Sequence, residues 1–358
     1  MTKLTLIRIV SVFIVTAIIA SICIVLWAKH WVTTPLNVSA DMVISVKKGD
    51  TLGKLAYQLE SDNMLSSAQL FILYARFEKK TKIEVGEYLL AKGSHHEQLL
   101  NLLYSGDVIR YQVTLVEGKT FDDFLSALQR NNKIKHTLDK SLTYTQLLEQ
   151  LQINVDHPEG WFFPDTYQFV SGMSDVDILR QAYQRMQDVL EEEWQKKSDN
   201  LPYASAYEAL IMASIIEKET GVAYERPEIA GVFVRRLQKG MRLQTDPTII
   251  YGLGREYKGN IRRKHLTQKT PYNTYVIDGL PPTPIAMPGR EAIHAALHPK
   301  SGKTLFFVAK GDGSHQFSIT LAEHNRAVRK YQIEQRRKQY RSSPASSPSN
   351  SQSTSTLK

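Results

Sequence analysis

Two glutamates near the end of an apolar stretch are the residues best suited, by type and position, to acid–base chemistry. Residues 206–221 read AYEALIMASIIEKETG, and 209–216 are apolar apart from Ser214. So continuous a run predicts a buried helix, which the glycine at 221 ends. A carboxylate in the last turn faces the negative end of the helix dipole, and partial burial also raises its pKa. Glu217 and Glu219 are therefore candidates for a general acid, the alternative being a solvated pair where the helix emerges.

The two glutamates do not form a facing pair of carboxylates. They are two positions apart, so a helix points them to roughly opposite sides. A glycosidase with two facing carboxyl groups would need its second one from Glu225, Asp246 or Asp165. The proline after Asp246 predicts instead that this aspartate caps a helix, and Glu225 lies at the start of another. The spacing therefore predicts one candidate acid, Glu217 or Glu219, without an obvious facing carboxylate.

Two segments have the composition of a sugar-binding cleft. Residues 159–167 read EGWFFPDTY, and residues 270–285 read TPYNTYVIDGLPPTPI. Aromatic faces pack against pyranose rings, Asn and Thr can bond hydroxyl and acetamido groups, and prolines hold a loop in one shape. The alternative is a core cluster beside a rigid loop.

Residues 41–106 are predicted to form a small unit of their own. Apolar periodicity predicts strands at 42–46 and 84–90, a helix at 52–60, a second helix from Ser66 or Ser67, and a third at 94–104. The opening VKKGDTLGKLA resembles the start of a LysM peptidoglycan-binding module. A spacer that binds nothing is the alternative.

The following part of the chain again mixes strands and helices. We expect a strand at 111–116, a helix beginning near Phe121, a charged amphipathic helix over 170–196 and another at 228–239. The triplet Gly-Lys-Thr at 118–120 is not a phosphate-binding loop, because Val113 stands where the earlier glycine is required. The whole pattern predicts an α+β fold.

The two ends of the chain differ from its average composition. Residues 9–28 carry no charge and are long enough to cross a bilayer, which favours a retained anchor over a cleaved signal peptide. Residues 323–341 indicate a basic helix, and 342–358 are almost entirely Ser, Pro, Thr, Asn and Gln, which predicts disorder. The lone cysteine, Cys23, excludes a disulfide framework and a cysteine-rich zinc site. The net charge of +9 suggests an anionic surface without identifying it.

Five ordered motifs together resemble the MltG (YceG-like) family of endolytic murein transglycosylases. They are EGWFFPDTY, ASIIEKET, GMRLQTDPTIIYGLG, TPYNTY and GLPPTPIAMPG, with Thr283 standing where many members carry Gly. The resemblance implies a cytoplasmic N-terminus (1–8), a transmembrane helix (9–28), a linker (29–40), a LysM-like subdomain (41–106), a larger mixed α/β catalytic domain (107–341) and a disordered tail (342–358). It also implies a lyase that cleaves the MurNAc-β-1,4-GlcNAc bond within glycan strands, leaves a 1,6-anhydro-MurNAc end and limits the length of nascent strands.

The same resemblance selects Glu219 as the catalytic residue. We expect a second set of residues to bind substrate: Trp161, Gln244, Thr245, Asp246, Tyr251, Tyr272, Asn273 and Thr274. It implies no metal and no cofactor, peptidoglycan as substrate, penicillin-binding synthases as partners, and no nucleic acid. The expected location is the bacterial inner membrane, N-terminus inside and catalytic domain in the periplasm. A non-catalytic, membrane-tethered peptidoglycan-binding scaffold is the alternative.

Overall fold

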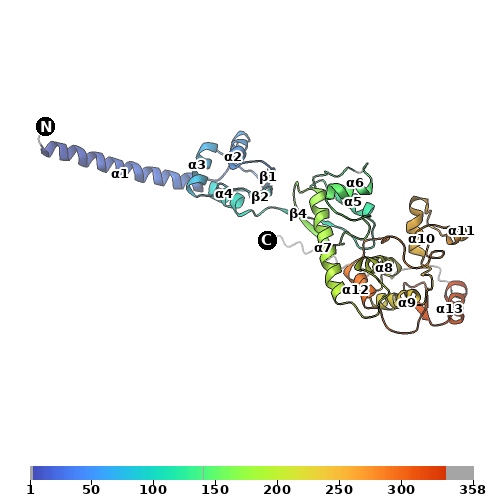
Figure 1. Cartoon of the computed structure of the whole chain (residues 1–358). Helices are drawn as coiled ribbons and strands as arrows, with labels where there is room; N and C mark the ends of the chain where they lie inside the picture. The colour runs from blue at the N-terminus through green and yellow to red at the C-terminus, as the bar shows by residue number, and fades with distance from the viewer. Residues whose placement is uncertain (1–2, 140, 336–358) are drawn as a thin grey trace. The chain divides into compact units, whose positions relative to one another are not determined.

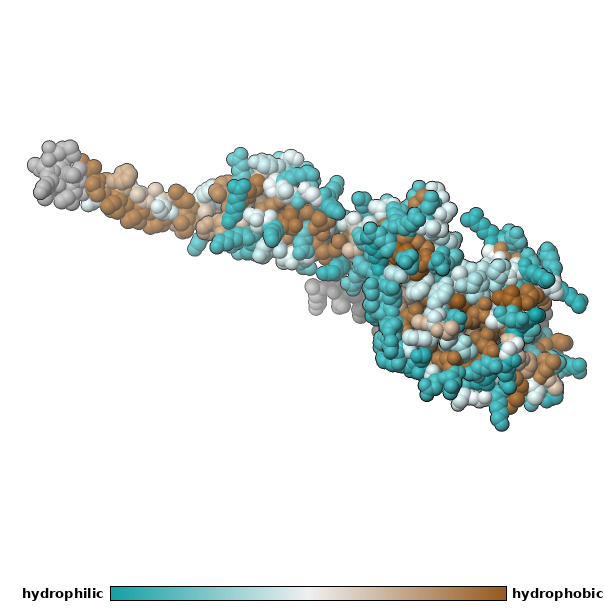
Figure 2. Space-filling view, in the orientation of Figure 1, coloured by the Kyte–Doolittle hydropathy of each residue, from teal (hydrophilic) through white to brown (hydrophobic). Residues whose placement is uncertain are grey.

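The chain begins with one long helix, α1 (Lys3–Thr33). Its segment Arg8–Thr33 is long and apolar enough to cross a membrane, and large apolar side chains along it, such as Phe13, are exposed. Figure 2 shows a largely apolar surface along the visible face of this helix. Because an exposed apolar surface of this size needs an apolar environment, the prediction of a membrane-anchoring helix is supported, and the helix extends beyond the predicted 9–28 at both ends.

The computed structural model describes residues 3–139 and 141–335, which fold as two units. One unit comprises Met1–Gln112 with Gln168–Met173, and the other Val113–Tyr167 with Ser174–Lys358. The predicted tail at 342–358 and the end of the basic helix predicted over 323–341 lie outside the described residues. The mixture of helices and strands in both units agrees with the predicted α+β class.

The first unit contains the strand–helix–helix–strand order expected from the sequence. Its elements are β1 (Met42–Val46), α2 (Leu52–Ser61), α3 (Ala68–Phe77), β2 (Gly86–Leu90) and α4 (His96–Ser105). The two strands pair antiparallel, with Met42 opposite Leu90. Thr51 and Ser67 cap α2 and α3 by accepting hydrogen bonds from backbone N–H groups three residues on. Local capping and periodicity therefore determine this unit.

The predicted polar linker at 29–40 is largely packed. Helix α1 continues to Thr33, Trp31 packs against His96 with ring centroids 4.0 Å apart and an interplanar angle of 35°, and Leu36 is buried. The backbone N–H of Leu36 donates to the Ser94 carbonyl at 2.8 Å. The few apolar side chains of this polar segment therefore complete the core of the first unit.

The second unit is mainly helical (Figure 1). The paired strands β3 (Arg110–Thr114) and β4 (Thr166–Val170) are each divided between the two units, whereas β5 (Phe306–Ala309) lies antiparallel to β6 (His315–Ser318) within the second. Its longer helices are α5 (Phe121–Gln129), α6 (Tyr144–Leu151), α7 (Asp175–Gln195), α8 (Ala206–Glu219), α9 (Arg226–Gln238), α10 (Asp246–Leu253), α12 (Arg290–Leu297) and α13 (Leu321–Val328). The short segments are η1 (Ala223–Glu225), η2 (Gly254–Glu256), α11 (Arg263–Thr267) and the π-helical η3 (Arg329–Glu334).

Helix α8 lies in the core of the second unit. Every residue from Ala209 to Ile216 is buried, as the uninterrupted apolar run predicts. Helices α7, α9, α10 and α12 all contact it. These contacts hold α8 in place. The polar residues after Ile216 therefore leave the core in a fixed direction.

Two predicted helices have different boundaries in the structure. The helix expected over 170–196 begins at Asp175, because Val170 ends β4 and the Ser174 hydroxyl caps the new helix. The basic helix expected from residue 323 begins earlier, at Leu321, where Thr320 and Glu323 form a capping box. In both places a polar capping residue, rather than the apolar pattern, defines the boundary.

Candidate active site

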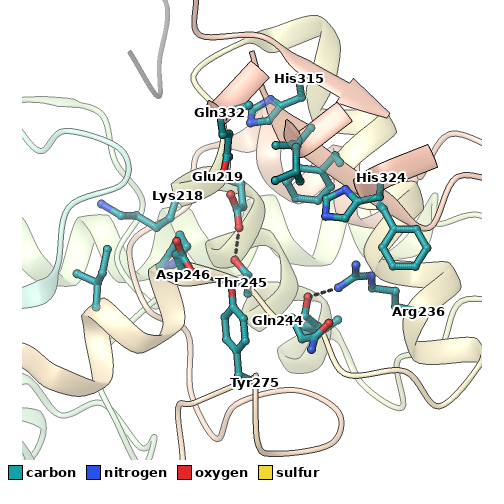
Figure 3. Close-up of a pocket in the computed structure, with 18 of the residues that line it drawn as sticks. Lys218, Glu219, Arg236, Gln244, Thr245, Asp246, Tyr275, His315, His324 and Gln332 are labelled. Atoms are coloured by element: carbon teal, nitrogen blue, oxygen red, sulfur yellow. Dashed lines mark hydrogen bonds between the residues drawn. The ribbon is translucent and has the colours of Figure 1, made fainter. Parts of the chain in front are cut away.

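A cavity of about 620 Å³ opens at the end of α8 in the second unit. Figure 3 shows polar side chains from several elements pointing into it. Its lining consists of Lys218, Glu219, Arg236, Leu243, Gln244, Thr245, Asp246, Pro247, Ile250, Tyr275, Phe306–Ala309, His315, Leu321, His324, Val328 and Gln332. A pocket of this size with convergent polar groups is suited to binding part of an extended ligand.

Glu219 ends α8 and faces this cavity. The Thr245 hydroxyl donates a hydrogen bond to its Oε1, drawn as a dashed line in Figure 3. Burial raises the pKa of Glu219 to about 7, against the opposing effects of the Thr245 hydrogen bond and the charge of Arg236, while the charge of Asp246 raises it further. A carboxyl group with this pKa exchanges its proton readily at neutral pH, as a general acid and base must.

Glu217 points elsewhere, as the spacing of two residues predicts. Its Oε2 accepts the Gly289 N–H at 3.0 Å, and its Oε1 lies 3.7 Å from the Arg226 guanidinium. Burial and the nearby Glu117 raise the pKa of Glu217, but Glu217 does not line the cavity. Its carboxyl group joins α8 to the start of α12 and of α9.

The residue that bonds Glu219 is itself held by buried threonines. The Thr245 backbone N–H donates to the Thr274 Oγ1 at 3.1 Å, and the Thr248 hydroxyl donates to the Thr245 carbonyl at 2.8 Å. The preceding residue, Gln244, has a φ of 51°, a left-handed conformation that is uncommon outside glycine. Such strain persists only where the surroundings fix it, so the loop that presents Thr245 is rigid.

Asp246 lies next to this contact but does not cap α10 as predicted. Thr245 occupies the N-cap position and Asp246 is the first helical residue, with no capping hydrogen bond from a side chain. The Tyr275 hydroxyl donates to Asp246 Oδ1 at 2.8 Å. The side chain of Asp246 therefore holds Tyr275 at the cavity wall, and its charge acts on Glu219.

Arg236 supplies a fixed positive charge at another side of the cavity. Its guanidinium donates to the Leu243 and Leu305 carbonyls, each at 2.7 Å, and lies over the Phe306 ring. These contacts join α9 to the 243–247 segment and to the residue before β5. Arg236 thus orders two walls of the cavity at once.

Two histidines from the C-terminal part of the second unit also line the cavity. His315 is buried with Glu225, and its Nδ1 lies 2.7 Å from Glu225 Oε2. His324 stacks on Phe306, and burial lowers its pKa. Because Glu225 is bound to His315, it is not free to serve as the second carboxylate considered above, and Asp165 does not line the cavity.

The structure brings only part of the predicted substrate-binding set to the cavity. Gln244, Thr245 and Asp246 line it with Glu219. Asn273 and Thr274 are almost fully buried behind it, and Asn273 donates to the His265 and Gln268 carbonyls. These two side chains shape the loop and do not reach the cavity.

The predicted aromatic residues form packed clusters away from the cavity lining. Trp161 stacks on Tyr207 with centroids 5.5 Å apart and an interplanar angle of 8°. Tyr251 packs edge-to-face on Tyr272 and donates to Glu159 Oε2 at 3.0 Å. All four rings are half-buried against the core of the second unit.

Sequence reasoning missed the cavity wall formed by β5, β6 and α13. The apolar run Phe306–Ala309 and the turn before His315 could have indicated a hairpin. The segment holding His324 looked like a solvated basic helix, and its distance along the chain from Glu219 gave no sign of their proximity. Only tertiary packing brings these residues together.

The cavity is polar and lined by two carboxyl groups, Glu219 and Asp246, of which burial raises the pKa of Glu219 to about 7. The model of the YceG-like family matches residues 44–330, and the chain belongs to this family.

The chain is similar to several known proteins. It is 32% identical to the endolytic murein transglycosylase of Bacillus subtilis (strain 168) over 305 residues, covering 80% of this chain and 84% of that protein. It is 26% identical to the endolytic murein transglycosylase of Streptococcus pneumoniae serotype 2 (strain D39 / NCTC 7466) over 323 residues, covering 80% of this chain and 58% of that protein. A crystal structure of a YceG-like protein from Listeria monocytogenes shares 29% identity with a TM-score of 0.48, covering 80% of this chain and 99% of that one.

Proposed function

We propose that this chain is a membrane-anchored lytic murein transglycosylase. It cleaves the β-1,4 bond between N-acetylmuramic acid and N-acetylglucosamine within peptidoglycan strands and leaves a 1,6-anhydro end. The observation that carries the proposal is Glu219, a carboxyl group with a pKa near 7 at the wall of the cavity. The name shared by the relatives from Bacillus subtilis and Streptococcus pneumoniae supports the substrate and the reaction.

Glu219 acts in both halves of this reaction. Its protonated form donates to the glycosidic oxygen as the bond from C1 to that oxygen breaks. The resulting carboxylate then accepts the proton of the muramic acid 6-hydroxyl as that oxygen bonds to C1. The first proton leaves on the released hydroxyl of N-acetylglucosamine, the 6-hydroxyl proton restores the Glu219 carboxyl group, and no water is consumed. This sequence requires one carboxyl group that is easily protonated and deprotonated at neutral pH.

The residues around Glu219 set its position and its proton affinity. The Thr245 hydrogen bond stabilises the carboxylate formed after the first half, whereas burial and Asp246 favour the protonated form needed at the start. Gln244 and Tyr275 provide an amide and a ring to hold sugar groups in the same cavity. We infer that these are the substrate-binding residues of the site, with Thr274 and Asn273 supporting them from behind.

We further propose how the chain is oriented in the membrane and what each of its parts does. Helix α1 crosses the inner membrane with the N-terminus inside, so that both units lie in the periplasm beside the wall. Residues 41–106 act as a LysM-like unit that holds glycan, residues 107–341 form the catalytic domain, and penicillin-binding synthases supply the nascent strands.

Labelling of an introduced cysteine tests the orientation, since Cys23 is the only cysteine of the sequence. In a chain with Cys23→Ser and Ser39→Cys, a membrane-impermeant maleimide should label the protein in intact spheroplasts. Labelling only in lysed cells would show that the orientation is inverted.

Digestion of purified peptidoglycan tests the catalytic proposal. The wild type should produce 1,6-anhydro ends within strands, and Glu219→Gln should not. Glu217→Gln is the matched control, because it changes a glutamate of the same helix end that does not line the cavity. Unchanged activity in Glu219→Gln would remove this residue from the mechanism. Binding of sacculi without any new ends in the wild type would favour the alternative of a non-catalytic scaffold.

A further inference from the structure

A second cluster of ionisable side chains lies in the second unit, away from the cavity. Glu193 is in the last turn of α7, His294 is on α12, and His298 follows the last residue of that helix. One ligand atom from each of the three lies within 4.8 Å of the others. None of the three lines the cavity at Glu219, so the cluster is separate from the proposed active site.

We propose that Glu193, His294 and His298 bind a zinc ion. Two imidazoles and one carboxylate are a donor set that zinc uses in proteins, with water completing the coordination. Imidazole nitrogens suit zinc and disfavour magnesium or calcium, which take oxygen ligands. The two histidines are four positions apart at the end of one helix, which places them on the same face.

The best indication of a missing partner is His298. Its Nε2 is buried and has no hydrogen-bond partner among the described residues. Its Nδ1 lies 3.3 Å from the Ser198 hydroxyl, just beyond the end of α7. Metal-binding histidines usually use one ring nitrogen for the ion while the other is held by a hydrogen bond, and Nε2 and Nδ1 of His298 suit these two roles.

Both carboxylate oxygens of Glu193 have a partner, and a cation bound here would replace the contact between Oε2 and His294. Its side chain is only 7% exposed, and Arg290 Nη1 donates to Oε1 at 2.7 Å. Oε2 lies 2.8 Å from Nδ1 of His294, whose side chain is 53% exposed and free to adjust. Arg290 therefore fixes the carboxylate from behind, while the opposite oxygen faces the histidine. The position also lies near the C-termini of two helices, where the dipoles favour a cation.

A zinc ion here would tie α7 to α12. Helix α12 packs against α8, and Gly289, just before α12, donates to Glu217 of α8. The ion would thus stabilise the layer of helices that presents Glu219 without touching substrate. Its effect should appear in stability before it appears in activity.

Zinc titration of the full chain tests this inference. The chain is purified in detergent without a polyhistidine tag, stripped with a chelator, and titrated with zinc chloride by calorimetry. We expect one zinc ion per chain and a rise in the melting temperature on zinc addition. Magnesium chloride should give neither. The absence of zinc binding, or equal binding of magnesium, would overturn the proposal.

Variants distinguish a metal site from a merely structural cluster. His294→Gln, His298→Gln and Glu193→Gln should each weaken zinc binding on the order of tenfold or more and remove the zinc-dependent rise in melting temperature. His136→Gln, which changes an exposed histidine elsewhere, is the matched control and should bind as the wild type does. Zinc binding that survives the histidine changes would contradict the assignment. It would also be contradicted if the variants were less stable than the wild type in chelator and zinc did not raise the melting temperature of the wild type. Glu219→Gln should bind zinc as the wild type does. A chain that binds no zinc would therefore overturn the zinc site without bearing on the proposed function.

Discussion

Glu219 and Glu159 are two carboxyl groups of the second unit whose pKa burial raises, and they differ in their access to solvent. Burial raises the pKa of Glu219 to about 7 and that of Glu159 to about 8. Each accepts a hydrogen bond from a hydroxyl, Glu219 from Thr245 and Glu159 from Tyr251. Glu159 also accepts the Phe121 N–H at 3.0 Å and is only 2% exposed, whereas Glu219 lines a cavity.

This comparison teaches that a raised pKa alone does not identify a catalytic acid. Glu159 has both oxygens engaged between α5 and α10 and is enclosed by the core. At Glu219, among the described residues, only Oε1 receives a hydrogen bond, which leaves Oε2 for a ligand. Burial raises the proton affinity of both glutamates, but only Glu219 lies at a cavity where a substrate can reach it.

The largest difference is expected when each glutamate is replaced by glutamine. Glu219→Gln should lower the rate of peptidoglycan cleavage by about 10²–10⁴-fold, the usual contribution of a general acid–base group. Glu159→Gln should stay close to the wild type at neutral pH, because Glu159 is mostly protonated there and glutamine has a similar shape. The check is the rate of new strand ends per enzyme for both variants. An equal loss of activity in both variants would mean that the difference in solvent access between the two glutamates does not decide which one is catalytic.

The second effect concerns stability and pH. The pKa of Glu159 rises from 4.5 to about 8 on folding, so between these values the folded chain holds a proton that the unfolded chain has released. The contribution of Glu159 to the free energy of unfolding is therefore complete below pH 4.5 and is lost as the pH rises through about 8. Between these values the free energy of unfolding falls by up to about 1.4 kcal/mol per pH unit because of this group. Glu159→Gln should flatten the fall of the unfolding free energy across this window, measured by denaturant titration. A profile parallel to that of the wild type would contradict the assignment.

A smaller effect is expected from the hydroxyl next to Glu219. Thr245→Val keeps the shape of the side chain but removes the hydrogen bond that lowers the pKa of Glu219. The pKa should rise, so the alkaline limb of the pH–rate profile should move upward, and the rate at neutral pH should fall about tenfold. Thr248→Val is a control for loss of a buried threonine hydroxyl nearby. A rate loss without any movement of the alkaline limb would indicate a purely structural role for Thr245.

The smallest effect is expected at Trp161. The sequence suggested that this ring binds substrate, but it stacks on Tyr207, and both rings are half-buried against the core. Trp161→Phe keeps an aromatic ring there and should leave kcat/KM within about twofold of the wild type. A large rise in KM with unchanged melting temperature would return Trp161 to the substrate-binding cleft.

These differences also show what the sequence could predict. Periodicity and capping residues determine local elements, so the buried helix α8 and the divergence of Glu217 from Glu219 follow from spacing. Gln244, Thr245 and Asp246 were found because a family motif groups them in the chain. Composition could not tell an aromatic core from an aromatic cleft, since both use the same side chains for the same apolar contact.

The remaining parts of the site depend on long-range packing. His315 and His324 reach the cavity from a hairpin and a helix that lie far along the chain from α8. Arg236 holds their wall through bonds to backbone carbonyls, which no side-chain motif reveals. The pKa of Glu219 likewise depends on burial by all of these elements and could be predicted only in its direction.

The most direct test of the account is the origin of the oxygen at each new strand end. Wild-type chain digests purified peptidoglycan in ¹⁸O-enriched water, and the products are analysed by mass spectrometry. If Glu219 directs attack by the sugar's own 6-hydroxyl, the new ends are 1,6-anhydro and carry no heavy oxygen. New reducing ends that carry the heavy isotope would show that water is the nucleophile, and the single-carboxylate transfer proposed here would be wrong.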